Sequence, residues 1–253
     1  MKLTFLGTGT SQGVPVIACN CPVCLSNDIH DKRLRTSVLI EHNKTSILVD
    51  AGPDFRQQML SAKVKNLDSI LLTHEHRDHI AGIDDVRAFN FVNKRPMDIW
   101  AEERVQKALQ TEFPYIFAKN KYPGTPEVTF HSINGLPFSI NDLKIIPIRA
   151  FHFKMPVYGF RIDNLTYLTD ANFIPDEEKE KMVGTQYLVI NALRKQKHIS
   201  HFSLPEALKL ISELSPRKAF ITHISHQMGL YKDVQKELPE NVFLAYDGLS
   251  INL

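Results

Sequence analysis

The stretch Thr73-His74-Glu75-His76-Arg77-Asp78-His79 places three imidazoles and the Asp78 carboxylate in the spacing H-x-H-x-D-H, within six positions. It follows the apolar run at residues 70–72, which predicts a buried strand, so the cluster stands at a strand end. Imidazole nitrogen and carboxylate oxygen atoms suit Zn²⁺, Mn²⁺ or Fe, and ligands so close in sequence need little loop ordering to converge. The alternative is a solvated polar loop. We predict a metal site at this strand end.

Length and charge exclude some broad classes of protein. The chain has 253 residues and a formal net charge of +2 at pH 7. A chain of this length buries roughly three quarters of its unfolded surface as one domain. No Pro-, Gly- or Ser-rich linker divides it, so we predict a single domain over residues 1–253. The balanced charge excludes a broad basic field for non-specific DNA binding and leaves a local patch open.

Targeting signals and cysteines indicate the compartment. The N-terminal apolar run is broken at Gly7, and no later stretch approaches the length of a membrane span. Three closely spaced cysteines, an odd number, suit a reducing compartment better than a disulfide framework. We therefore expect a cytoplasmic protein that is not anchored in a membrane. The sequence leaves the oligomeric state open, a homodimer included.

Along the chain, short apolar runs and runs of alternating polar and apolar residues are separated by segments in which apolar residues have helical spacing. Strands are expected at residues 2–6, 36–41, 46–49, 70–72, 128–131, 143–149, 157–162, 165–168, 187–191 and 219–222. Helices are expected at residues 54–62, 80–91 and 102–111, and a solvated helical face at 176–181. Ser203 and Glu206 form a capping box that begins a helix ending at Leu214. We expect the second half to be mainly antiparallel sheet, with Asp247-Gly248 as a hairpin turn.

Polar residues of metal-ligand type follow several other apolar runs. His152 follows residues 145–150, Asp170 follows residues 167–169, and His223 follows residues 219–222. Asp50 ends the pair of strands that precedes the histidine stretch. Any one of these residues alone is more often an ordinary loop residue than a ligand.

In order and local setting, these residues together resemble the metal-binding motifs of the metallo-β-lactamase superfamily. The resemblance covers essentially the whole chain and implies an α/β (α+β) fold, a four-layer αββα sandwich with the metals at one edge. It implies a first metal held by His74, His76 and His152. It implies a second metal held by Asp78, His79 and His223, with Asp170 bridging the two. Asp50 is expected to accept hydrogen bonds that fix the histidine loop, not to bind metal.

The N-terminal loop holds a second candidate metal site. Its thiols, at Cys19, Cys21 and Cys24, lack only one ligand for a closed tetrahedral zinc site. The loop resembles that of the cyclic phosphodiesterase family of bacterial phosphonate breakdown, and this resemblance supplies His226 as the fourth ligand. A structural zinc there would join an N-terminal loop to a C-terminal one and contribute to folding. The alternative is a set of free buried thiols.

His201 stands just before the capped helix that ends at Leu214. It resembles the family's extra histidine, which contacts the substrate phosphate or protonates the leaving alkoxide, and a helix N-terminus also favours an anion. The alternative is a solvent-exposed loop residue. Asp78 and His201 are the candidate catalytic residues. We interpret the remaining histidines as ordinary surface or loop residues: His30, His42, His131 and His198.

Three further features have ordinary interpretations. The aromatic loop, residues 113–126, is expected to pack on the sheets, with a pocket rim or base stacking as alternatives; its aromatic residues include Phe113, Tyr115, Phe117 and Tyr122. The glycines of residues 7–13 are not followed by the lysine of a phosphate-binding loop, so we expect a plain turn. Arg87 is expected on the surface of a helix.

The resemblance implies a binuclear metal-dependent hydrolase, a phosphodiesterase for small or cyclic phosphate esters, in which a metal-bridging hydroxide attacks phosphorus. Its cofactors would be two active-site ions, Zn or Mn with Fe as a further choice, and one structural zinc. One alternative is a tRNA 3′-end processing endonuclease, whose basic RNA-gripping arm the sequence does not show. Another is a non-hydrolytic pyrroloquinoline-quinone biosynthesis protein B-like protein, in which the histidine stretch is degraded. The substrate and the native metal stay open.

Overall fold

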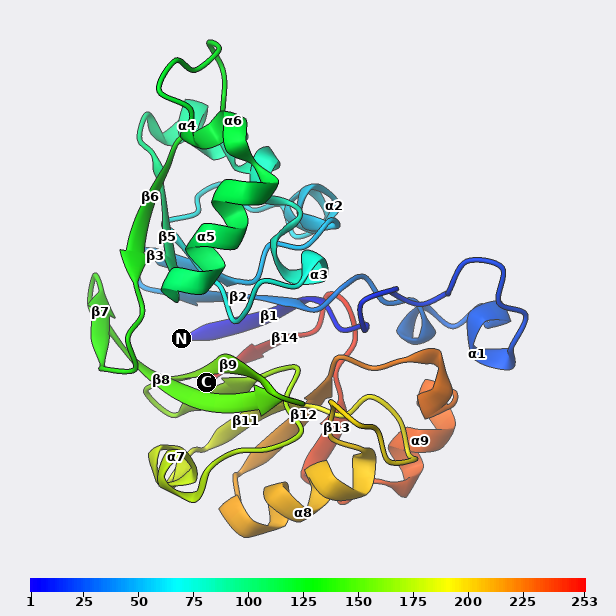
Figure 1. Cartoon of the computed structure of the whole chain (residues 1–253). Coiled ribbons are helices and arrows are strands. Elements are labelled where there is room, and N and C mark those ends of the chain that lie inside the picture. Colours follow the sequence, from blue (N-terminus) through cyan, green and yellow to red (C-terminus); the bar gives the residue numbers. More distant parts are fainter.

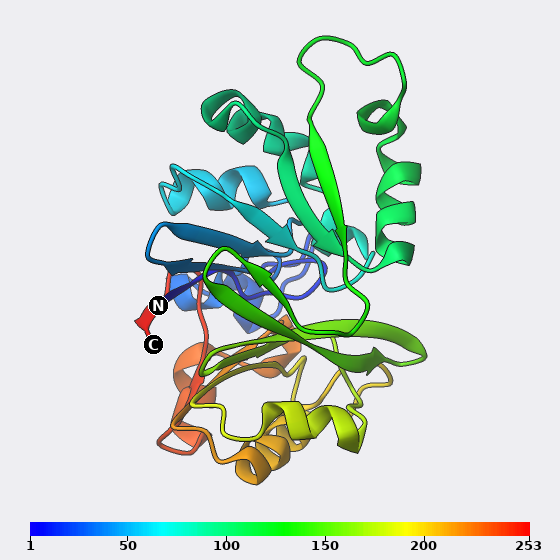
Figure 2. The same cartoon turned by 90° about the vertical axis from the view of Figure 1, so that its left-hand side faces the viewer.

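Two seven-stranded sheets face each other in the structure, a computed structural model that describes residues 1–253 (Figure 1). Their strand orders are β14-β1-β2-β3-β4-β5-β6 and β13-β12-β11-β10-β9-β8-β7. Helices cover the outer side of each sheet, as the rotated view in Figure 2 also shows. The four-layer αββα sandwich implied by the resemblance is therefore confirmed.

The first sheet is antiparallel from β14 to β3 and parallel from β3 to β6. Its strands are β1 (Lys2–Gly7), β2 (Ser37–His42), β3 (Thr45–Val49), β4 (Ser69–Leu71), β5 (Met97–Ala101), β6 (Val128–Ser132) and β14 (Ser250–Asn252). The helices of this half are α2 (Phe55–Ser61), α3 (Arg77–Ile80), α4 (Arg87–Asn93), α5 (Glu103–Glu112) and α6 (Pro114–Phe117).

The second sheet is antiparallel from β7 to β10 and parallel from β10 to β13. Its strands are β7 (Phe138–Ile140), β8 (Leu143–His152), β9 (Met155–Ile162), β10 (Leu165–Leu168), β11 (Tyr187–Asn191), β12 (Lys218–Thr222) and β13 (Val242–Leu244). Its helices are α7 (Asp176–Lys179), α8 (Leu204–Leu214) and α9 (Tyr231–Glu237). The short helix α1 (Pro22–Leu25) belongs to the N-terminal loop.

The core lies between the sheets and again between each sheet and its helices. Phe5 of β1 packs against Phe220 of β12, with ring centroids 5.6 Å apart. Burying an aromatic side chain of this size stabilises the fold by about 1.5–3 kcal/mol. None of the helices combines the length and the apolarity that crossing a bilayer requires.

The helix predicted over residues 80–91 is interrupted. The chain forms α3, a 3₁₀ turn (Ile83–Val86) and α4 instead, so Asp78 and His79 lie on a helix and not in a loop. The break occurs because the Gly82 N–H donates to the Ala51 carbonyl, 2.8 Å away. A Cβ at Gly82 would lie 2.2 Å from the Gly52 carbonyl oxygen. Close contact with the β3–α2 connection therefore interrupts the helix.

Asp247-Gly248 is not a hairpin turn, and that prediction is wrong. The strands on either side, β13 and β14, pair with β12 and β1 in different sheets. Asp247 accepts hydrogen bonds from Thr8 Oγ1 at 2.7 Å and from the Leu34 N–H at 2.6 Å. Burial raises the pKa of this carboxyl to about 6. The turn therefore anchors a crossing between the two sheets.

The second half of the chain also differs from the predicted antiparallel sheet. The strand predicted at residues 128–131 is β6, which lies in the first sheet, parallel to β5. Strand β7 was not predicted, and β10 to β13 are parallel because the connections through α7, α8 and α9 are crossovers.

The aromatic loop includes α6 and packs only in part. Phe117 stacks on Phe130 with ring centroids 5.1 Å apart, and Phe113 packs against the buried cluster of the first half. The Tyr115 hydroxyl donates to Asp84. Tyr122 is 84% exposed, in the segment that projects beyond α6 in Figure 1. The predicted packing is therefore found at the start of the loop and not at Tyr122.

Arg33 is buried, and its guanidinium fixes the N-terminal loop. Its Nη1 donates to Thr8 Oγ1 at 2.7 Å and to the Ala245 carbonyl at 2.6 Å. Arg33→Ala is expected to lower the free energy of unfolding by about 3 kcal/mol, because buried acceptors lose their donor. Urea unfolding would measure the change against Arg217→Ala, which removes an exposed arginine. Equal stability of the two variants would contradict the prediction.

Candidate metal centre

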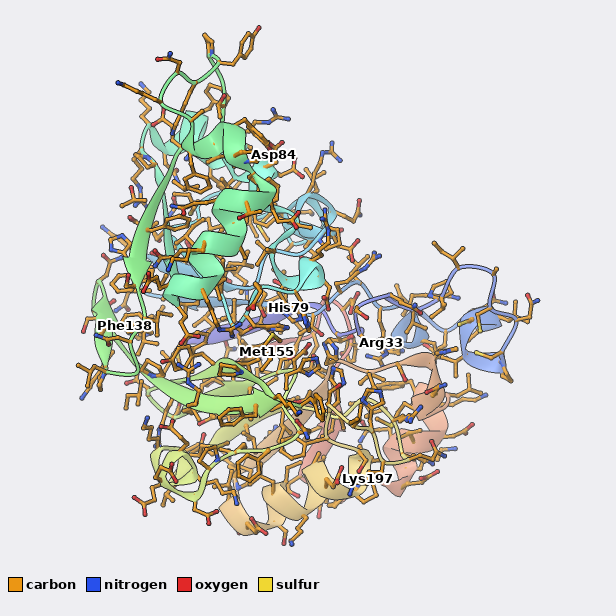
Figure 3. All side chains as sticks on the ribbon, viewed as in Figure 1. Arg33, His79, Asp84, Phe138, Met155 and Lys197 are labelled. Atoms are coloured by element: carbon orange, nitrogen blue, oxygen red, sulfur yellow. The ribbon has the colours of Figure 1, made fainter.

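The predicted metal ligands meet at one edge of the sandwich. His74 follows β4 and His79 lies on α3. His152 ends β8, and Asp170 and His223 follow β10 and β12. Figure 3 shows His79 at the junction of the two halves of the chain, and Met155 is labelled on the other half. Met155 is the strand partner of His152.

Backbone conformation aims several of these side chains. Asp50, Asp170 and His223 have φ angles of 64°, 54° and 55°, in the left-handed region that residues other than glycine seldom adopt. Such conformations cost about 1–3 kcal/mol each and persist where the surrounding structure enforces them. Strain of this kind at three strand ends is typical of a functional site.

Asp78, His79, Asp170 and His223 form the tightest group. Each offers one ligand atom, and all four atoms lie within 4.8 Å of one another. His79 Nε2 lies 3.2 Å from a carboxylate oxygen of both Asp78 and Asp170. His223 Nδ1 lies 2.8 Å from Asp170 Oδ1. The structure thus brings together all the residues predicted for the second metal.

The first predicted set is more open. His74, His76 and Asp170 form a second group within 4.8 Å. His152 stands beside it, with its ring centroid 5.1 Å from that of His76 and 5.9 Å from that of His74. It groups instead with Asp170 and His201. Asp170 is common to all three groups, which is the position that a bridging ligand requires.

Three buried imidazole nitrogens at this site make no well-directed hydrogen bond: His74 Nε2, His79 Nε2 and His223 Nδ1. Asp170 oxygens lie close to the last two of them. A buried polar atom without a hydrogen bond is costly, and native structures rarely keep one without a function. The opposite nitrogen of each ring is held in place, by Thr73 Oγ1 at 2.9 Å, Asp50 at 2.7 Å and Thr10 Oγ1 at 3.2 Å respectively. The rings are therefore oriented with a free nitrogen facing the carboxylates, and these residues fit a divalent metal.

Asp50 has the role predicted for it. Its carboxylate accepts from the Thr73 N–H and Thr73 Oγ1, both at 2.9 Å, and from His79 Nδ1 at 2.7 Å. Both carboxylate oxygens thus accept hydrogen bonds from the histidine loop. Sequence analysis missed Thr10 and Thr73, because a threonine near a ligand carries no local signal.

Burial and neighbouring carboxylates shift the pKa values of three histidines at the site. Burial would lower the pKa of His79, but Asp78, Asp170 and Asp50 surround the ring and hold its pKa well above the usual value. Burial lowers the pKa of His74 well below the usual value and that of His152 to about 4. Both of these rings are therefore neutral at pH 7, the form that binds metal.

His201 is 9% exposed, so the interpretation as a solvent-exposed loop residue is wrong. Its Nε2 lies 3.7 Å from Asp170 Oδ2, and its ring stacks on His223 with centroids 5.0 Å apart. Its Nδ1 lies 3.1 Å from Nδ1 of His198 and 3.1 Å from Ser200 Oγ. His201 therefore borders the metal ligands from the α8 side.

Other predictions for charged and aromatic residues had mixed outcomes. His30, interpreted as an ordinary residue, stacks on Tyr231 and meets Tyr246 edge-on, each with ring centroids 4.5 Å apart. His198 contacts His201, so it too has a defined place. Arg87 is 52% exposed and pairs with Asp84, as expected for a surface arginine.

The N-terminal cysteines and His226 converge, although they are separated by some 200 positions in the sequence. The sulfur atoms of Cys19, Cys21 and Cys24 lie 3.3, 3.3 and 3.6 Å from His226 Nδ1. Burial opposes ionisation of Cys21, but the Cys24 N–H and His226 hold the pKa of its thiol down to about 6. All four ligand atoms lie within 4.8 Å of one another, the arrangement that a tetrahedral thiolate site needs.

Residues 45–224 match the family described as beta-lactamase superfamily domain. The chain belongs to the metallo-β-lactamase superfamily. Within it, the protein is PhnP-like: the crystal structure of a new diphosphatase from the PhnP family superposes with a TM-score of 0.93. That similarity includes 36% sequence identity and covers 100% of this chain and 97% of the other.

Two curated relatives of this metallo-β-lactamase superfamily protein are named for activities other than that of a diphosphatase. An octanoyltransferase of Porphyromonas gingivalis is 40% identical over 252 residues, which are 98% of this chain and 51% of that protein. A ribonuclease Z of Prochlorococcus marinus is 27% identical over 168 residues, 64% of this chain and 49% of the relative. The chain thus spans about half the length of these relatives.

Proposed function

We propose that this protein is a binuclear metal-dependent phosphodiesterase that acts on small or cyclic phosphate esters. The observation that supports this is the set of buried imidazole nitrogens that make no well-directed hydrogen bond and converge on Asp170. The first-metal set is His74, His76 and His152. The second-metal set is Asp78, His79 and His223, and Asp170 serves both. Two divalent ions, when bound, supply an activated water and positive charge for the phosphoryl oxygens.

The PhnP-family diphosphatase supports a reaction at phosphorus, since it is similar to the whole chain. The octanoyltransferase name does not assign acyl transfer to this chain, because about half of that protein lies outside the match. The intact histidine stretch argues against the pyrroloquinoline-quinone biosynthesis protein B-like alternative. The ribonuclease Z match keeps the tRNA endonuclease as a second candidate.

Turnover assays with defined metals test the proposal. Metal-free protein is restored with Zn²⁺ or Mn²⁺ and assayed with bis(p-nitrophenyl) phosphate, 2′,3′-cyclic nucleotides and a diphosphate ester. We expect metal-dependent cleavage of a phosphate diester. Cleavage of precursor tRNA on a gel, without turnover of the small esters, would favour the endonuclease. No cleavage by protein with both sites loaded would refute the proposed chemistry.

We assign His201 to the substrate phosphate or the leaving oxygen. Its Nε2 faces the ligands while its Nδ1 faces Ser200 and His198, so one nitrogen can contact substrate while the other is held. His201→Ala is expected to lower kcat by about 10²- to 10⁴-fold, the usual effect of removing a general acid. Metal content should stay at two active-site equivalents.

The control for this substitution is His42→Ala, which removes a histidine that pairs with the exposed Asp142. Its turnover should equal that of the wild type. Full turnover of His201→Ala with loaded metals would remove His201 from the mechanism. A loss of bound metal in His201→Ala would show instead that this residue is a ligand.

A further inference from the structure

We propose that Arg104 is a positioning residue that holds the two sides of the first-metal set in register. The proposal rests on the proposed function, because it assumes that a metal binds to His74, His76 and His152. Arg104 lies on α5 and is not itself in a position to bind metal. It acts through the chain segments that carry these three ligands.

One contact fixes the side of the first-metal set that comes from the first half of the chain. Arg104 Nη1 donates to Glu75 Oε2. Glu75 is the residue between His74 and His76, so its side chain controls the segment that carries both ligands. The two side chains are 27% and 29% exposed, which leaves their ion pair partly shielded from water.

A second contact fixes the opposite side. Arg104 Nη2 donates to the Pro156 carbonyl on β9. Pro156 is the strand partner of Phe151, and the next pair along the ladder joins Met155 to His152. One guanidinium therefore contacts the backbone beside His152 and the side chain between the other two ligands.

The guanidinium is itself held in one orientation. Its Nε donates to Glu102 Oε2 at 2.9 Å. Glu102 also binds Arg149 through two hydrogen bonds of 2.7 and 3.1 Å, and the Arg149 guanidinium lies 3.7 Å from the centre of the Tyr158 ring. Because two carboxylates already neutralise Arg104, its function is geometric and not that of a free phosphate binder. The planar guanidinium spreads its donors over three nitrogens in a rigid fork, whereas all three donors of a lysine ammonium leave from one nitrogen and cannot span these three acceptors.

The first-metal set needs such support more than the second. His76 is exposed and His152 is half-buried, whereas His79 and His223 are only 0% and 1% exposed. Two of the three second-set ligands are therefore fixed by packing, whereas in the first set only His74 is equally buried, at 0% exposure. Partners that orient metal ligands typically contribute 10- to 100-fold to metal affinity.

Metal titration tests the proposal. Metal-free wild type, Arg104→Ala and Arg104→Lys are titrated with Zn²⁺ against a chromogenic chelator. We expect both substitutions to weaken one active-site equivalent about 10- to 100-fold and to leave the other unchanged. Arg77→Ala is the matched control: it removes an arginine from the histidine stretch itself, but this arginine is 74% exposed and its ion pair is with Glu112.

A variant that lacks one ligand shows which of the two bound metal ions is affected. His76→Ala removes a ligand of the first-metal set, so adding Arg104→Ala should cause no further loss of affinity. Wild-type affinity for both equivalents in Arg104→Ala would overturn the inference, and so would equal weakening of both, which indicates a general structural effect. Wild-type protein that binds no active-site metal would refute the proposed function itself.

Discussion

Asp170→Asn is expected to lower metal-dependent diester turnover by about a thousandfold or more and to release bound metal. Asp170 is 2% exposed and belongs to all three groups of converging ligands at the candidate active site. Asparagine keeps the shape and tolerates the left-handed φ of 54° at this position, so the change removes charge while retaining the backbone. Metal charge contributes several kcal/mol to a phosphoryl-transfer transition state, and each 1.4 kcal/mol corresponds to tenfold in rate.

Metal content and turnover are measured together in this experiment. Elemental analysis should show that Asp170→Asn retains fewer than two active-site equivalents, and the turnover assay should use saturating Zn²⁺ or Mn²⁺. Asp176→Asn is the control, since it makes the same exchange at a side chain that is 95% exposed. Wild-type turnover of Asp170→Asn would remove the bridging role and with it the binuclear assignment.

The parts of the site that sequence predicted are those that local patterns mark. The stretch from His74 to His79 is visible because its ligands are neighbours, and Asp170 and His223 are visible because each follows a buried strand. Thr10 carries no such mark. Its contact with His223 joins positions 213 apart, and only the folded chain brings them together.

The errors in the predicted fold have one physical origin. Asp247-Gly248 has the composition of a hairpin turn, but turn chemistry does not determine which sheet each flanking strand joins. Likewise residues 80–91 have helical spacing, yet the hydrogen bond from Gly82 to Ala51 breaks the helix. In both places a long-range contact overrides a local preference.

Replacing Cys21 and Cys24 together by serine is expected to remove one zinc equivalent and to lower the free energy of unfolding by several kcal/mol. The four ligand atoms of this site join the N-terminal loop to the turn after β12. A link that closes about 200 residues removes roughly 5 kcal/mol of entropy from the unfolded chain. Two Zn–thiolate bonds cannot be replaced by hydroxyls, which are poor zinc ligands.

The loss of stability should be partial because the loop has other anchors. The Tyr231 N–H donates to Asp31 Oδ1 at 2.8 Å, and Arg33 holds Thr8 and the Ala245 carbonyl. These contacts lie outside the cysteine cluster and do not depend on zinc. We therefore expect the two sheets to stay folded while α1 and its flanking residues open.

Limited proteolysis separates local opening from global unfolding. In the double variant, and in wild type treated with a chelator, cleavage should begin between residues 14 and 30 while the rest of the chain persists. Active-site metal and turnover should be largely retained, since His223 is held by Thr10 and its own strand. His42→Gln serves as a control beside His226→Gln, because only the latter removes a zinc ligand. Unchanged zinc content in the double cysteine variant would favour free buried thiols, and the hydrogen bonds of Asp31 and Arg33 would then be sufficient to hold the loop.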